Sequence, residues 1–215
     1  MNDPYFFMTV LAPSFVLLPV SAALYRYRSL PAAGKALLYY LLIETVILAT
    51  SSALAYYKLP NTGLYHVSTV VEMLLLLFFF SHVFSNRKMV VYIKWAMLLF
   101  PVLALLNTLF LQPLNNFNSH TISLQYGLVI LLCFVYWLQP AEEPVTAWAQ
   151  QPLNWISSGM LLYFSGSFVL FAFSAYINSH FSKQTNIVIW NVHAALAMLM
   201  YILMAIGFLK YKRHE

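Results

Sequence analysis

Residues 64 to 84 read LYHVSTVVEMLLLLFFFSHVF, a stretch that contains one acidic residue, Glu72, and neither Lys nor Arg. From Met73 to Phe80 every position is apolar, whereas a strand of a membrane barrel would alternate polar and apolar side chains. A helix of about 20 apolar residues crosses the roughly 30 Å hydrocarbon core of a bilayer. This stretch therefore predicts a transmembrane helix.

Six further stretches have the same character. The chain has 215 residues, of which 62% are hydrophobic and 8% charged, whereas about a quarter of the residues of a soluble protein carry charge. A water-soluble globule is excluded, and the fold class predicted is an all-α polytopic membrane bundle of seven transmembrane helices. The connections are too short for a separate soluble domain, so residues 1–215 form one transmembrane domain. The predicted spans are Tyr5–Tyr25, Ala36–Tyr57, Leu64–Phe84, Met89–Leu111, His120–Leu138, Leu153–Ile177 and Ile187–Phe208.

The basic residues predict the orientation of the bundle. Lys and Arg concentrate in cytoplasmic connections, and with the N-terminus outside and the C-terminus inside, nine of the eleven Lys and Arg lie on the cytoplasmic side. Only Lys58 and Lys183 then lie outside. The net charge of +5 is explained by this arrangement, and we expect a lipid bilayer and no nucleic acid as partner.

The sequence lacks the motifs of several enzyme classes. There is no His-Glu-x-x-His and no Gly-x-Ser-x-Gly, the patterns of many metalloproteases and serine hydrolases. Cys133 is the single cysteine, so neither a disulfide within the chain nor a cysteine-rich zinc site is available. We expect no catalytic residue, no metal and no cofactor.

An internal similarity links the third and seventh spans. Residues 64–74 (LYHVSTVVEML) match residues 189–199 (IWNVHAALAML) without gaps. Two interpretations stay open: three helices, a linker helix and three more helices arranged as a parallel repeat, or chance matches between apolar segments.

Two acidic residues, Glu44 and Glu72, lie well inside predicted spans. A carboxylate at the centre of a bilayer costs about 2.5–3.5 kcal/mol on insertion scales, so such residues face the interior of a bundle and mark functional sites by default. The alternative is a structural hydrogen bond between helices. Helical spacing places Tyr65, Ser68 and Thr69 on the same face as Glu72.

His193 lies two turns into the seventh span, on a face with Trp190. The internal similarity would place Glu72 and His193 on opposite walls of one cavity. Together with Tyr65, most polar side chains then gather in the outer half of the bundle, and these include His66, Asn191, His120, Ser123 and Gln125. This gathering predicts a ligand pocket open to the outside. His66 near the interface, and Trp190 with many Tyr at helix ends, are also typical of an interfacial belt.

Four segments carry a resemblance to a known group of proteins. They are residues 63–72 (GLYHVSTVVE), 163–167 (YFSGS), 189–194 (IWNVHA) and 205–208 (AIGF). Together they resemble a group of small, uncharacterised seven-span proteins of the bacterial inner (plasma) membrane, associated with sensor histidine kinase systems. The resemblance implies a role in signalling and brings no site residues.

These observations lead to one expectation and two alternatives. We expect a multipass inner-membrane sensor or receptor-like component that binds a small molecule or a proton through Glu72, Glu44 and His193 and acts on a cytoplasmic signalling protein. The first alternative is a small-solute or proton-coupled transporter. The second is an intramembrane enzyme that modifies lipid.

Overall fold

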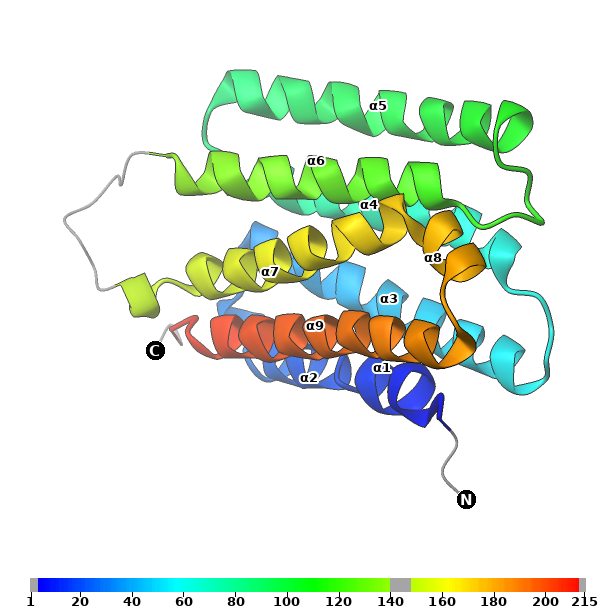
Figure 1. Ribbon diagram of the computed structural model, residues 1–215. Coiled ribbons are helices and arrows are strands. Elements are labelled where there is room, and N and C mark those ends of the chain that lie inside the picture. Colours follow the sequence, from blue (N-terminus) through cyan, green and yellow to red (C-terminus); the bar gives the residue numbers. More distant parts are fainter. Residues whose placement is uncertain (1–3, 140–147, 213–215) are drawn as a thin grey trace.

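The computed structural model describes residues 4–139 and 148–212, and within these ranges it contains helices and no strand (Figure 1). Seven helical stretches are long and apolar enough to cross a membrane, which confirms the predicted multi-pass helical bundle. The seven are Phe7–Tyr25, Ala32–Tyr56, Thr62–Val83, Arg87–Phe110, Ser119–Trp137, Pro152–Ala172 and Lys183–Leu209.

The first span is interrupted near its N-terminal end. It begins with a π-helical segment, η1 (Phe7–Leu11), continues as α1 (Ala12–Ser14) and then as α2 (Leu17–Tyr25). Pro13 lacks the N–H that would donate to the Thr9 carbonyl in an α-helix. Ser52 donates its hydroxyl to that carbonyl at 2.9 Å. The irregular backbone thereby ties the first span to α3 (Ala32–Tyr56).

The remaining elements follow in chain order. A 3₁₀ turn, η2 (Tyr27–Ser29), precedes α3, and another, η3 (Trp148–Gln150), precedes the sixth span. The helices after α3 are α4 (Thr62–Val83), α5 (Arg87–Phe110), α6 (Ser119–Trp137), α7 (Pro152–Ala172), α8 (Ser174–His180) and α9 (Lys183–Leu209).

Six of the seven spans form a ring, and the seventh lies outside it. Going round the ring, α2 packs against α3, α3 against α4, α4 against α6, α6 against α7, α7 against α9, and α9 against α2. Helix α5 lies at the edge of the bundle, against α4 and α6 (Figure 1). The space enclosed by the ring is therefore lined by the first, second, third, fifth, sixth and seventh spans.

Helices α7 and α9 approach each other closely because glycines lie where they meet. A Cβ atom on Gly207 would lie 2.7 Å from Cγ1 of Ile156, and one on Gly166 would lie 2.7 Å from Cδ1 of Leu196. Both distances are too short for a real contact. Small residues of this kind let membrane helices pack with a short distance between their axes.

The space inside the ring is filled differently at the two ends of the bundle, and each end is called a half of the ring below. The half that contains the α2–α3 and α4–α5 connections and the C-terminal end of α9 is filled by apolar side chains that interlock, as in a close-packed core. Every helix of the ring contributes side chains to this core. Among them are Val20, Ala23, Leu37, Leu41, Met73, Leu76, Phe80, Val129, Cys133, Ile156, Met160, Met204 and Phe208.

The Lys and Arg residues are distributed unequally between the two ends of the bundle. Of the described Lys and Arg residues, Arg26, Arg28, Lys35, Arg87, Lys88, Lys94, Lys210 and Lys212 lie towards the end that carries the filled core. Lys58 and Lys183 lie at the opposite end, where the chain starts (Figure 1). The basic residues from which the N-out, C-in orientation is predicted therefore gather at one end of the bundle.

The sixth span differs from the prediction of one helix over Leu153–Ile177. Helix α7 ends at Ala172, and α8 continues in a new direction from Ser174 (Figure 1). Phe173, between the two, has φ −105° and ψ 14°. Neither Pro nor Gly lies at the break, so the local sequence gives no signal for it.

Candidate functional site

A cavity of about 410 Å³ occupies the other half of the ring, at the end of the bundle where the chain starts. All six spans of the ring contribute lining residues, and none comes from α5. The volume lies in the range of roughly 300–1,000 Å³ that is usual for small-molecule sites. The cavity ends where the filled core begins.

One wall of the cavity carries both membrane-embedded carboxyl groups. Glu44 comes from α3 and Glu72 from the neighbouring α4, and their side chains interact with each other. The amide nitrogen of Gln125 donates to Oε2 of Glu72 at 3.4 Å. Tyr201 of α9 lies beside Glu44, whose Oε2 atom is buried without a hydrogen-bond partner among the described residues. Lys and Arg are absent from the described residues that line the cavity.

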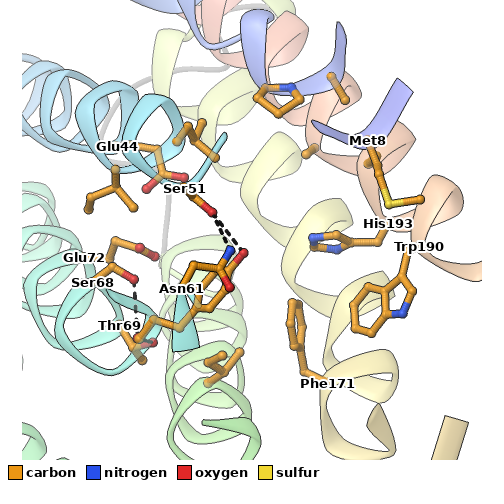
Figure 2. A pocket seen from close by; sticks show the side chains of 18 of the residues that line it. Met8, Glu44, Ser51, Asn61, Ser68, Thr69, Glu72, Phe171, Trp190 and His193 are labelled. Atoms are coloured by element: carbon orange, nitrogen blue, oxygen red, sulfur yellow. Dashed lines mark hydrogen bonds between the residues drawn. The ribbon is translucent and has the colours of Figure 1, made fainter. Parts of the chain in front are cut away.

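The opposite wall carries His193 of α9 (Figure 2). Its Nδ1 atom lies 2.8 Å from the hydroxyl oxygen of Ser167 on α7, and the two atoms are hydrogen-bonded. Ser167 is fully buried behind the imidazole, with 0% of its surface exposed. Such a bond from a second residue fixes the orientation of an imidazole. The ring is thereby held at the cavity surface.

Aromatic side chains surround His193 and extend along the wall. The rings of Tyr163, Phe171 and Trp190 have centroids 5.3, 5.1 and 5.9 Å from the imidazole centroid. Tyr163 and Tyr126 join their hydroxyl groups in a 2.8 Å hydrogen bond. The cavity therefore combines two carboxyl groups on one side with an aromatic surface on the other.

Polar side chains gather towards the open end of the cavity. The Ser51 hydroxyl on α3 lies 3.2 Å from the Tyr65 hydroxyl on α4, and the amide of Asn61 donates to Ser51 at 3.2 Å (Figure 2). These bonds join the end of α3 to the start of α4. They also hold hydroxyl groups near the entrance, where a ligand would pass.

Five of the seven residues predicted from the sequence line this cavity. They are Glu72, Glu44, His193, Tyr65 and Trp190. They come from three different helices, α3, α4 and α9, and the ring arrangement brings them together.

His66 and Asn191 do not line the cavity, contrary to the expectation from the sequence. His66 is buried against α5, with Nδ1 3.0 Å from the Thr108 hydroxyl and Nε2 3.0 Å from the Asn116 carbonyl. It therefore joins α4 to α5 and to the connection that follows. Asn191 lies two residues before His193, which is about 200° around the helix, so its side chain faces away from the cavity.

Tyrosines at helix ends were expected to form an interfacial belt, whereas three tyrosines that the sequence pattern did not single out also line the cavity. These are Tyr126, Tyr163 and Tyr201, each of which lies inside the ring. For Tyr201 a signal existed, because it lies eleven residues after Trp190, close to three full helical turns. Phe171 carried no such signal, because it lies within the apolar run of residues 168–173.

The arrangement is suited to binding and to proton exchange. The carboxyl groups accept hydrogen bonds and attract positive charge, and the imidazole can donate or accept. Among the described residues, no three His, Cys, Asp or Glu side chains gather in a way that could hold a metal ion.

Comparisons of the chain with protein-family models, with curated proteins and with solved structures find no match.

Proposed function

We propose that this protein is a membrane receptor or sensor that binds a small molecule or a proton in the cavity and passes the change to a cytoplasmic signalling protein. The observation that carries the proposal is the division of the ring into two halves. The cavity with Glu44, Glu72 and His193 occupies one half, and a close-packed apolar core fills the other. Under this proposal a ligand enters the cavity from the end where the chain starts and meets the filled core beyond it.

The apolar core would transmit the structural change that follows binding of a ligand or a proton in the cavity. Glu44 and Glu72 lie about one turn from core residues on the same helices, Leu41 and Leu76 among them. A shift of the carboxyl groups therefore moves α3 and α4 against their neighbours. Packed helices shift by about 1–2 Å in such transitions. The basic connections at the far end would present that shift to the partner.

The orientation proposed is N-out and C-in, in the inner membrane of a bacterium. It is supported by the concentration of the described Lys and Arg residues at the end opposite the cavity. In this orientation the cavity opens to the outside of the cell. The basic end then faces the cytoplasm, where a signalling partner would bind.

A nitroxide distance measurement on the full chain in nanodiscs tests the proposal without knowledge of the ligand. Labels are placed at Ser85→Cys and Gln150→Cys, both exposed at the basic end. Glu72→Gln removes the charge that a bound cation or proton would neutralise. We expect Glu72→Gln to change the distance between the two labels by roughly 2 Å. Val67→Leu, on the exposed side of the same helix, should leave that distance unchanged. Identical distances in Glu72→Gln, Glu44→Gln and the double variant would refute the receptor mechanism.

The ring arrangement favours a second candidate, a small-solute or proton-coupled transporter. The contacts of the first three spans correspond to those of the last three, and α5 lies outside, as expected for two parallel three-helix units joined by a linker. Proteoliposomes with a trapped pH-sensitive dye test this function. Solute-driven proton movement that is lost in Glu44→Gln would favour transport.

A lipid-modifying enzyme finds less support in the site. The Ser167 and His193 pair has the composition of a nucleophile and a base, but a nucleophile must reach its substrate. Ser167 is fully buried between α7 and α9. Its hydroxyl therefore orients the imidazole and is closed to a substrate in the cavity.

A further inference from the structure

The charge of the cavity indicates which class of ligand it accepts. Glu44 and Glu72 face each other, and the structure shows no ion pair between either carboxyl group and a described Lys or Arg side chain. A buried carboxylate without a positive partner is costly, and the cost is removed when a cation binds beside it. An anionic ligand would meet two carboxyl groups and no cationic side chain among the described lining residues.

The aromatic wall adds a second preference for the same class. Phe171 and Trp190 flank His193 across the cavity from the carboxyl groups (Figure 2), and Tyr163 packs against the same imidazole with its ring centroid 5.3 Å away. The faces of aromatic rings attract cations, and the surface also accepts methyl and alkyl groups by burial of apolar area. A charged head with an apolar body fits both walls at once.

The donor set and the volume distinguish an organic cation from a metal ion. Two carboxyl groups without a third His, Cys, Asp or Glu nearby do not complete a metal site. A cavity of about 410 Å³ holds a molecule of several heavy atoms. The hydroxyl groups of Ser51 and Tyr65 at the entrance can bond to a polar substituent of such a molecule.

We propose that the cavity binds an organic ammonium ion, an amine or a quaternary ammonium compound, with its charge against Glu44 and Glu72 and its apolar part against Tyr163, Phe171 and Trp190. The inference rests on the proposed function, since it names the ligand of the same cavity. It assigns distinct roles to the two walls. The carboxyl groups discriminate by charge, and the aromatic rings discriminate by shape and apolar surface.

Binding of two isosteric probes to the purified full chain tests the proposal. Choline and 3,3-dimethyl-1-butanol have the same shape, and only choline carries a charge. Putrescine and phenethylamine extend the series to primary amines. We expect at least one of the three cations to bind in calorimetric titration and to raise Tm by roughly 5 °C at about 100 times its Kd. The neutral alcohol should produce neither effect.

Variants of the carboxyl groups and the aromatic wall locate the binding. Glu72→Gln should weaken the best cation at least about tenfold, as loss of a charged partner does, and Glu72→Asp, which keeps the charge, should bind it. Trp190→Leu should weaken it several-fold. Trp95→Leu is the matched control, because Trp95 lies on α5 outside the ring with 57% of its surface exposed, and it should bind as wild type does.

The inference is overturned if the neutral alcohol binds as tightly as the best of the three cations, or if Glu72→Gln leaves the affinity for that cation unchanged. It is also overturned if none of the three cations binds at about 10 mM, which corresponds to a Kd weaker than that of typical small-molecule sites. Failure of this kind leaves the receptor proposal standing, because the label distances in Glu72→Gln are measured without any ligand. Conversely, cation binding without a change in those distances would support the ligand class and refute the receptor mechanism.

Discussion

The hydroxyl oxygen of Ser167 lies 2.8 Å from Nδ1 of His193 and joins α7 to α9 behind the aromatic wall of the cavity. Ser167 has no backbone partner in its own helix, unlike Ser165, whose hydroxyl donates to the Leu161 carbonyl. The bond to His193 is therefore the interaction that satisfies the Ser167 hydroxyl in a fully buried position. Two serines on one helix thus have different roles.

Replacement of Ser167 by Ala should lower the free energy of unfolding by about 1 kcal/mol, because a buried hydrogen bond between helices is lost. Ser165→Ala is the matched control and should change it by less than about 0.5 kcal/mol, since Ser165 is exposed. Unfolding of the purified protein by SDS, followed by circular dichroism, measures both. Equal losses in the two variants would contradict the assigned role of the bond.

The glycines at the α7–α9 contact lead to a second prediction. A Cβ atom on Gly207 would lie 2.7 Å from Cγ1 of Ile156 and 2.8 Å from the backbone oxygen of Pro152. Gly207→Ala should destabilise the bundle by about 1–3 kcal/mol, because the Pro152 backbone cannot yield as a side chain does.

Gly127 is the control for this substitution. The nearest atom to its Cβ position is Cε2 of Phe168, at 3.7 Å, an ordinary contact. Gly127→Ala should leave stability unchanged or raise it by up to about 1 kcal/mol, because alanine is the better helix former. SDS unfolding of the two variants distinguishes a close helix contact from a general effect of added methyl groups. Stabilisation by Gly207→Ala would refute the contact.

The sequence predicted the number of spans because each span needs its own long apolar run, which is a local property. It also predicted that Glu44, Glu72 and His193 face protein, since the cost of exposing them to lipid is independent of the fold. Their approach to one another depends on the order of helices in the ring. That order is set by packing between distant segments, such as the glycine contacts of α7 with α9.

The errors have the same origin. His66 and Tyr65 are neighbours in sequence, and both are polar residues near a helix start. Only the position of α5 decides that His66 bonds to Thr108 whereas Tyr65 reaches the cavity. The break at Phe173 likewise lacks a Pro or Gly to mark it. Tertiary contacts between separate helices determine both features.

The contacts of His66 predict a structural role that binding and stability measurements can separate. His66→Ala should lower the free energy of unfolding by about 1–3 kcal/mol, because bonds to Thr108 and to the Asn116 carbonyl are lost from a buried position. The affinity for the cation that binds best should stay within about twofold of wild type, since independent sites do not couple. His82→Ala on the same helix should change neither quantity, because His82 is exposed. A large loss of affinity for that cation in His66→Ala would show that the two sites are coupled.

The orientation of the bundle can be tested without altering the basic residues that predict it. Leu114→Cys lies in the connection between α5 and α6 at the cavity end, with 52% of its surface exposed, and Ser85→Cys lies in the exposed connection between α4 and α5. A membrane-impermeant maleimide applied to intact spheroplasts should label Leu114→Cys, whereas Ser85→Cys should react only after the membrane is permeabilised. The wild-type protein is the control, because Cys133 has 0% of its surface exposed and should react in neither case. The opposite labelling pattern would place the cavity on the cytoplasmic side, and a receptor for an external ligand would then be ruled out.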